Sequence, residues 1–174
     1  MRLFIAINFP ADIKAEIAKI RDNVKEAAFR GNFSFDENLH LTLVFLGECD
    51  AQQTETVKSV FDEIVFSEFP LSLEKVGYFK RDSGATWWVG LKENKPLSDL
   101  QANLTGRLQQ KGFILESRKY FPHVTFGREV KLRPGFVQPK VMQVGFKVTS
   151  IELMKSERIN GKLTYTPIYS IKNR

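Results

Sequence analysis

The chain has 174 residues, of which 43% are hydrophobic, and its 26 Lys and Arg against 20 Asp and Glu give a formal net charge of +6. This length suffices for one sizeable core, and the single cysteine, Cys49, excludes an internal disulfide framework and a thiolate metal cluster. The positive charge favours encounters with polyanions, although the basic residues are dispersed along the sequence.

The first predicted element is a strand at residues 2–9, "RLFIAINF", where apolar residues dominate. This apolar run is too brief for a signal peptide or a membrane-spanning helix, so we expect a cytoplasmic protein that makes no membrane contact. A helix is predicted next, over residues 10–29, because a proline suits its first turn and four apolar side chains recur on one side. These side chains belong to Ile13, Ile17, Ile20 and Val24.

The rest of the chain continues with strand and helix patterns. Period-two patterns predict strands at residues 40–47, 71–79, 85–92, 123–127, 146–156 and 162–171. Helical spacing predicts helices at residues 52–66 and 96–112, the second of which begins at a proline and ends in a glycine. The last two strands flank "INGK", a favourable hairpin turn.

The predicted elements form an internal repeat. Residues 2–47 and residues 85–129 each contain a strand, a helix and a strand that opens on a histidine. The two histidines are 83 positions apart (123 − 40), and the same shift carries Phe4 onto Trp87. We therefore expect one bilobal domain over residues 1–174, with two lobes related by an approximate two-fold axis. Because one chain contains both halves of the predicted site, we expect a monomer.

The two histidines stand in matching motifs, "HLTLVFLGE" and "FPHVTFGRE". His40 is followed two places later by Thr42, and His123 is followed by Thr125. Residues i and i+2 of a strand point to the same face, so each His-Thr pair lies side by side. The intervening apolar side chains are expected to enter the core; they are Leu41, Leu43, Phe45, Val124 and Phe126.

Two such pairs facing one another would surround a small tetrahedral anion. Each imidazole titrates near neutrality, and each threonine hydroxyl can donate a hydrogen bond to an anionic oxygen. One neutral and one protonated imidazole can remove a proton from an attacking hydroxyl or water and deliver one to the leaving oxygen. The motifs therefore predict acid-base phosphoryl transfer by His40 and His123. Neither motif has the ligand spacing of a metal site, so we expect no metal and no cofactor.

These motifs, together with the N-terminal "RLFIAI", resemble the 2H phosphoesterase superfamily, specifically its RNA 2′,3′-cyclic phosphodiesterase branch, also called 2′-5′ RNA ligase. The resemblance extends to the closing "LTYTPIYSI" and implies an α+β fold of two lobes, each with an antiparallel sheet and helices, around a central cleft. It also implies metal-independent hydrolysis of a terminal 2′,3′-cyclic phosphate to a 2′-phosphate. The implied partners are RNA ends or nucleoside 2′,3′-cyclic phosphates.

The resemblance also implies individual roles. His40 matches the proton donor to the leaving 3′ oxygen, and His123 matches the proton acceptor from the attacking water. Thr42 and Thr125 match the hydroxyls that hold phosphate oxygens. Arg128 matches a basic residue that binds phosphate, yet it lies five positions after the second histidine, so a regular strand would point it to the opposite face. A bulge at the preceding glycine would redirect it.

Other functions stay open at this stage. One is a 2′-5′ RNA ligase or 2′-5′ phosphodiesterase, in which a ribose hydroxyl replaces water, and another is a non-catalytic RNA-binding module. Four aromatic residues are candidates for stacking on terminal bases, although large aromatic side chains in small domains usually fill the core. They are Trp87, Trp88, Tyr120 and Phe121. The basic candidates for steering the RNA backbone are Lys80, Arg118 and Lys119.

Overall fold

The structure, a computed structural model, describes all 174 residues and consists of nine strands, three α-helices and one short 3-10 helix. The strands of the first half are β1 (Arg2–Asn8), β2 (Ala28–Phe33), β3 (His40–Glu48) and β4 (Phe69–Phe79). Those of the second half are β5 (Ala85–Leu91), β6 (His123–Leu132), β7 (Gly145–Val148), β8 (Ser150–Ile159) and β9 (Lys162–Lys172). The helices are α1 (Ala11–Ala27), α2 (Ala51–Glu63), α3 (Lys95–Gln110) and η1 (Asp36–Asn38).

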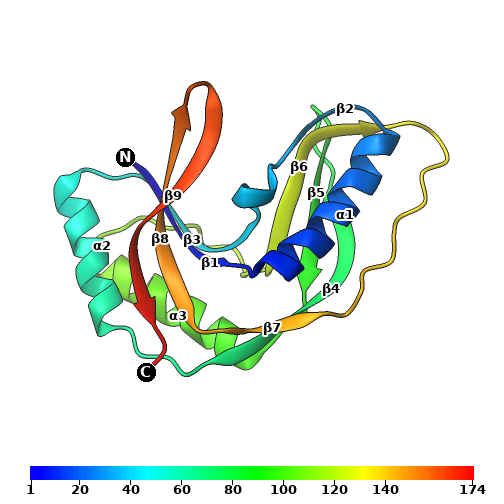
Figure 1. The fold of residues 1–174 in the computed structure, drawn as a ribbon. Coiled ribbons are helices and arrows are strands. Elements are labelled where there is room, and N and C mark those ends of the chain that lie inside the picture. Colours follow the sequence, from blue (N-terminus) through cyan, green and yellow to red (C-terminus); the bar gives the residue numbers. More distant parts are fainter.

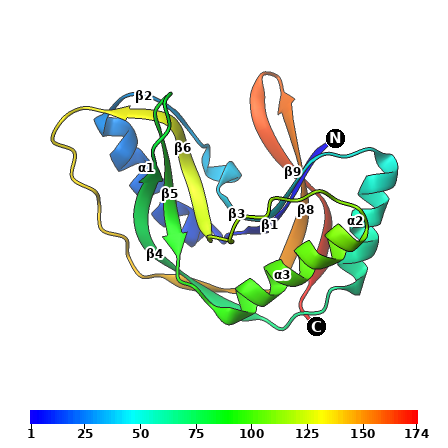
Figure 2. The same cartoon turned by 180° about the vertical axis from the view of Figure 1, so that it is seen from behind.

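The strands form two antiparallel sheets. Sheet A has the order β3-β1-β8-β9, and sheet B has the order β2-β6-β5-β4-β7. Helices α2 and α3 lie beside sheet A and α1 lies beside sheet B, so the sheets stand between the helices (Figure 1). The view from behind shows the same arrangement (Figure 2). The predicted two-lobed α+β fold is confirmed. None of the helices has the length and apolar character needed to cross a membrane.

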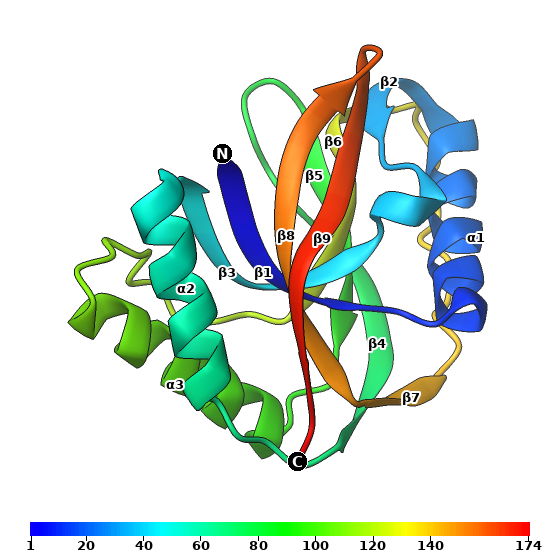
Figure 3. The same ribbon diagram turned by 60° about the vertical axis from the view of Figure 1, so that its left-hand side comes forward.

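Each helix of the predicted repeat covers the sheet of the other half. Strands β1 and β3 are neighbours in sheet A, but the helix between them, α1, contacts β6 and β2 of sheet B. Strands β5 and β6 are neighbours in sheet B, whereas α3 packs against β3, where Gln101 donates a hydrogen bond to the Leu43 carbonyl at 3.3 Å. Figure 3 shows α1 and the α2-α3 pair on opposite sides of the strands. One core of 37 buried hydrophobic residues runs through both lobes, so neither lobe has an interior of its own.

Several elements match the sequence prediction closely. The four apolar side chains predicted for the inner side of α1 are all buried: Ile13, Ile17, Ile20 and Val24. The predicted hairpin turn joins β8 to β9, and its central residues, Asn160 and Gly161, have φ angles of 51° and 79°. Two positive φ angles are typical of the turn that matches the twist of paired strands.

Other elements differ from the prediction. The single strand predicted at residues 146–156 is two strands, β7 in sheet B and β8 in sheet A, with Thr149 between them. The first helix ends at Ala27 rather than at residue 29, and the chain continues as β2, an edge strand. The mostly exposed side chains of β2 give no apolar alternation, so the sequence did not indicate this strand. Helix α2 likewise ends at Glu63, three residues before the predicted end at residue 66.

Strand β3 contains a bulge after its His-Thr pair. Ala6 of β1 lies opposite Thr42. The next residue back, Ile5, lies opposite Val44. Leu43 therefore has no partner on β1, and the alternation of side chains reverses beyond it.

Strand β6 contains a bulge at the equivalent place. Trp88 of β5 lies opposite Thr125. Trp87 lies opposite Gly127. Phe126 is therefore the extra residue, and like the extra residue of β3 it is the third after the motif histidine. In both strands the fifth residue after the histidine is turned to the face of the histidine.

The bulge in β3 overturns the prediction that Phe45 enters the core. Phe45 is 52% exposed, whereas Leu41 and Leu43 are buried as predicted. Val124 and Phe126 of the second motif are also buried as predicted. The alternation of side chains between the two faces of the strand holds up to each bulge and fails immediately after it.

The strand pairing also corrects the register of the repeat. Asn8 lies opposite His40, and Gly90 lies opposite His123. The first strands of the two halves therefore match with a shift of 82 (90 − 8) rather than 83. Phe4 and Trp87, which the sequence aligned, are therefore not equivalent. Phe4 packs on a motif histidine, whereas Trp87 packs on Tyr78 and Phe136.

The bulge in β3 predicts unequal costs for two phenylalanine truncations. Phe126→Ala should lower the free energy of unfolding by about 3–5 kcal/mol, because its fully buried ring leaves a cavity. Phe45→Ala should cost less than about 1 kcal/mol, because its ring is on the surface. Urea unfolding of both variants measures the difference. Equal losses would contradict the bulge and place Phe45 in the core.

Candidate active site

His40 opens strand β3 with both ring nitrogens engaged. Its Nδ1 lies 2.7 Å from the carbonyl oxygen of Asn38, and its Nε2 lies 3.0 Å from Oγ1 of Thr42. Because a carbonyl oxygen only accepts, Nδ1 carries the proton, and Nε2 of the neutral ring accepts from the threonine hydroxyl. The rings of Phe4 and Tyr165 pack against the imidazole at centroid distances of 4.8 and 5.2 Å. Nε2 is thus the nitrogen left for proton transfer.

His123 opens strand β6 and is held in the same way. Its Nδ1 lies 2.7 Å from the carbonyl oxygen of Phe121, again two residues earlier in the chain, so its Nδ1 also carries the proton. The Phe121 ring stacks on the imidazole at 5.4 Å with an interplanar angle of 24°, and the edge of Phe79 approaches at 5.6 Å. Both motif histidines therefore leave Nε2 as the reactive nitrogen.

Burial sets the protonation state of both histidines. It lowers the pKa of His40 from 6.5 to about 4, against an opposing hydrogen bond to the Asn38 carbonyl, and the charges of Lys14 and Arg128 lower it further. Burial also lowers the pKa of His123, against the hydrogen bond to the Phe121 carbonyl, with a further decrease from Arg128 and Arg118. Both rings are neutral at pH 7 when no anion is bound. A bound phosphate would act in the opposite direction, because negative charge stabilises an imidazolium.

Arg128 lies between the two motifs in electrostatic terms. It is the fifth residue after His123, so the bulge in β6 turns it to the histidine's face. Its charge lowers the pKa of both histidines and also acts on Tyr165 of sheet A. The charge of this one guanidinium therefore acts on side chains of both sheets, and a phosphate near both imidazoles would be attracted to it.

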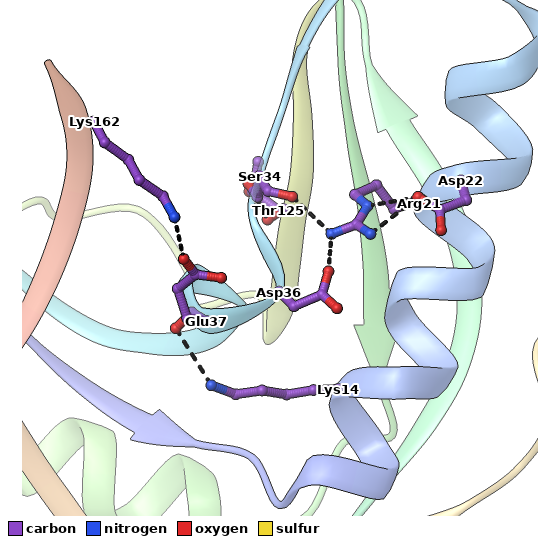
Figure 4. Close-up of polar contacts among 8 residues, drawn as sticks. All are labelled: Lys14, Arg21, Asp22, Ser34, Asp36, Glu37, Thr125 and Lys162. Atoms are coloured by element: carbon purple, nitrogen blue, oxygen red, sulfur yellow. Dashed lines mark hydrogen bonds and ion pairs between the residues drawn. The ribbon is translucent and has the colours of Figure 1, made fainter.

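The segment between β2 and β3 connects the His40 motif to both lobes. From α1, Arg21 donates a hydrogen bond to Asp36 at 2.5 Å, and Lys14 donates to the Glu37 carbonyl at 3.3 Å. From β9, Lys162 donates to the Glu37 carboxylate at 2.5 Å (Figure 4). Cations from both sides thus hold Asp36 and Glu37 of η1 and fix the approach of the chain to His40.

Asn38 completes this connection in the interior. Its side chain is 6% exposed and donates to the Leu163 carbonyl of β9 at 2.9 Å, while its own carbonyl accepts from His40. A buried amide that lost this partner would cost about 1–3 kcal/mol. Asn38 therefore fixes the imidazole relative to sheet A, although its side chain does not contact the ring.

Each motif threonine is held by the segment that leads into the other motif. The Tyr120 hydroxyl donates to the Thr42 carbonyl at 2.9 Å. In the other direction, the Ser34 hydroxyl lies 3.5 Å from the Thr125 carbonyl (Figure 4). Burial raises the pKa of Tyr120, so its hydroxyl keeps the proton that it donates. These reciprocal contacts link the positions of the two threonines, and β3 and β6 contact each other directly.

The structure divides the predicted aromatic candidates by location. Trp87 is buried and lines a cavity of about 410 Å³ that neither histidine borders. Trp88 is 7% exposed and packs beside His123, and Tyr120 holds the first motif. Phe121 keeps 38% of its surface exposed, so it is the one candidate of the four with a large open face.

Sequence reasoning missed three aromatic residues that pack on the histidines. Phe4 and Tyr165 contact His40 from β1 and β9, and Phe79 contacts His123 from β4. Phe4 and Tyr165 come from β1 and β9, whose places in sheet A relative to β3 are decided by sheet order, which the sequence patterns do not reveal. Of the basic candidates, Arg118 lies close enough to lower the pKa of the second histidine, whereas Lys80 and Lys119 are exposed. No group of three or more His, Cys, Asp or Glu side chains is arranged to hold a metal ion.

Comparison with known proteins gives consistent matches. Residues 9–160 match the family described as the 2′-5′ RNA ligase superfamily. The RNA 2′,3′-cyclic phosphodiesterase of Thermotoga maritima is 31% identical over 98% of this chain and 92% of its own length. The protein of the same name from Escherichia coli is 29% identical over 96% of this chain and 93% of its own length.

Solved structures match over nearly the whole chain. The crystal structure of Escherichia coli LigT complexed with 3′-AMP is 28% identical and superimposes with a TM-score of 0.86 over 99% of this chain and 97% of that chain. The complex of the same protein with phosphate gives a TM-score of 0.76 at 27% identity, over 99% of this chain and 96% of that chain. The two sheets and their flanking helices are therefore a fold shared with these proteins.

The pKa shifts can be tested with single charge removals. Arg128→Gln should raise the pKa of both histidines toward 6.5, because a positive charge that disfavours each imidazolium is lost. Lys14→Gln should raise only the pKa of His40, and Arg118→Gln only that of His123. Proton NMR titration resolves the effects, because the protein has only two histidines. An effect of Arg128→Gln on one histidine alone would contradict its position between the motifs.

Proposed function

The chain belongs to the 2′-5′ RNA ligase superfamily, and on that premise we propose that it is an RNA 2′,3′-cyclic phosphodiesterase, which hydrolyses the terminal cyclic phosphate of RNA to a 2′-phosphate. Relatives that carry this name cover most of the chain, which supports the proposal. We also propose that one bilobal chain, with repeat units at about residues 2–47 and 85–129, is the functional unit, since each unit supplies one histidine.

One observation carries the proposal. The two histidines occupy equivalent positions, each with Nδ1 bound to a backbone carbonyl and Nε2 left for chemistry, and one guanidinium acts on both. Two imidazoles, together with a nearby cation, are the groups that proton transfer at phosphorus needs. Structural histidines would not require this duplicated arrangement.

In the proposed reaction, His123 Nε2 accepts a proton from water while the water oxygen forms a bond to phosphorus. The bond from phosphorus to the 3′ oxygen breaks, and His40 Nε2 donates its proton to that oxygen, which leaves the phosphate on the 2′ oxygen. Each proton transfer contributes roughly 10²- to 10⁴-fold to the rate. The anionic substrate opposes the effect of burial on the pKa of His40, so the ring takes up the proton that it donates when the substrate binds.

Three side chains would hold the non-bridging oxygens during this step. Thr42 and Thr125 follow the two histidines on the same faces and supply neutral hydroxyl donors, and Arg128 supplies the cation. Hydrogen bonds to the charge that develops on phosphoryl oxygens stabilise the transition state. No step of this scheme requires a metal ion, so we propose a metal-independent enzyme.

The histidine roles can be tested without a metal. In EDTA, the purified protein should convert a nucleoside 2′,3′-cyclic phosphate to the 2′-phosphate, and His40→Ala and His123→Ala should each lower kcat at least about 100-fold. Chromatography of the products and circular dichroism of the variants measure activity and fold. Lys111→Ala, at the exposed end of α3, is a control that should keep full activity.

Two outcomes would contradict the proposal. Full activity in either histidine variant would remove the two-histidine mechanism. RNA binding without hydrolysis of any cyclic or 2′-5′ substrate would favour the alternative of a non-catalytic RNA-binding module.

A second candidate function is 2′-5′ transfer, in which a ribose hydroxyl takes the place of the attacking water. The exposed ring of Phe121, stacked on His123, favours it, because it offers a face for a second nucleoside on the nucleophile's side. This activity would use the same two histidines, so it is compatible with hydrolysis.

Phe121 should therefore affect transfer more than hydrolysis. With a 2′,3′-cyclic phosphate RNA and a second RNA bearing a 5′ hydroxyl, Phe121→Ala should lower the yield of 2′-5′ linked product relative to hydrolysis about 5- to 100-fold, the usual value of one base-aromatic stack. Nuclease-resistant linkages identify the product. Equal losses in both reactions would mean that the ring only orients His123, and Phe121→Tyr should behave like the unaltered protein.

A further inference from the structure

An exposed phenylalanine stands on the site face of sheet A without any role in the core. The bulge in β3 turns Phe45 to the face of His40, where its ring is 52% exposed. The guanidinium of Arg2 lies over this ring, 5.1 Å from its centroid. We call these two residues the Arg2-Phe45 pair.

The Arg2-Phe45 pair lies next to the candidate site along strand β1. Phe4 packs on the His40 ring and lies opposite Phe45, and Arg2 is two residues further along the same strand. Two residues of a strand span roughly 6.6 Å, so Arg2 leaves the strand about one nucleotide step beyond Phe4, the residue that packs on the imidazole.

Tyr165 joins the pair to the catalytic groups. The edge of its ring contacts His40 at 5.2 Å, and the charges of both Arg2 and Arg128 act on its hydroxyl. Burial keeps this hydroxyl protonated by raising its pKa. An aromatic and basic strip thus leads outward from His40: Tyr165, then Phe45 and Arg2.

The charge of Arg2 is not neutralised within the protein. Arg2 is exposed, and no carboxylate forms an ion pair with it, in contrast to Lys155 and Lys162 on the neighbouring hairpin. A free cation that rests on an exposed aromatic ring matches single-stranded RNA, which offers a phosphate and an adjoining base.

We propose that the Arg2-Phe45 pair binds the nucleotide on the 5′ side of the reacting one, Arg2 contacting the connecting phosphate and Phe45 stacking on the neighbouring base. This inference rests on the proposed function, and it makes RNA chains of two or more nucleotides better substrates than free nucleoside 2′,3′-cyclic phosphates. Stacking tolerates any base, so the preference is for a chain and not for a sequence.

The test compares two substrates of one enzyme. These are adenosine 2′,3′-cyclic phosphate and the dinucleotide ApA ending in a 2′,3′-cyclic phosphate. Arg2→Gln should lower kcat/KM for the dinucleotide about tenfold, the value of one charge-assisted contact, and change the mononucleoside value less than about twofold. The slope of log kcat/KM against log salt should fall by about 0.7 for the dinucleotide only.

Two further variants isolate the proposed contacts. Phe45→Ala should lower kcat/KM for the dinucleotide about 5- to 100-fold. Phe45→Tyr should retain it, because any aromatic ring can stack. Arg81→Gln is the matched control, since Arg81 lies over the Phe79 ring at 5.6 Å on the other sheet. It should leave both substrates unchanged.

The outcomes separate this proposal from the proposed function. Equal losses on both substrates, or a loss of dinucleotide preference in Arg81→Gln instead of Arg2→Gln, would overturn the assignment of the pair. If neither substrate were hydrolysed, the proposed function would fail. Equilibrium binding of ApA 2′-phosphate and adenosine 2′-phosphate to the same variants would then still test the role of the Arg2-Phe45 pair. If Arg2→Gln raises the Kd of the dinucleotide alone, the role is supported. If it does not, the role is overturned.

Discussion

One extra residue in each motif strand decides which side chains meet beside the histidines. Without Leu43 and Phe126 as unpaired residues, the alternation of β3 and β6 would send Phe45 and Arg128 into the core side of their sheets. A buried guanidinium without a partner would be costly, and the phosphate site would lack its cation. The extra residue has the same place in both strands. The fifth residue after each histidine therefore faces the same way, and it is Phe45 in β3 and Arg128 in β6.

The second constraint is the backbone carbonyl two residues before each histidine. It fixes which nitrogen carries the proton, and Asn38, which supplies the carbonyl for His40, is itself held by a hydrogen bond to β9 of the same sheet. Burial of the rings lowers the pKa of both histidines, so both imidazoles are neutral at pH 7 until an anion binds. In the proposed mechanism, free and occupied states of the site therefore differ in proton content, and substrate binding is coupled to proton uptake.

The sequence was sufficient for most of the strands, the three α-helices and the duplicated histidines, because these depend on local periodicity and on one repeated motif. It was insufficient for Phe45 and Arg128, because a bulge is a property of a pair of strands, and β1 and β5 supply the missing half of the information. The contact of Tyr165 with His40 could not be predicted for a related reason. It depends on the order of the strands in sheet A, which the sequence patterns do not show. The strands β7 and β8 were joined in the prediction because a chain that crosses between sheets can stay extended throughout.

The exchange of helices between the halves makes each half depend on the other for the cover of its sheet. A single strand-helix-strand unit places its helix where it cannot cover its own strands, so such a unit would expose the apolar face of its two-stranded sheet. Two identical copies would solve this by covering each other, which is domain swapping with two-fold symmetry. Because one chain contains both halves, different residues, Phe45 and Arg128, stand at the equivalent position of β3 and β6.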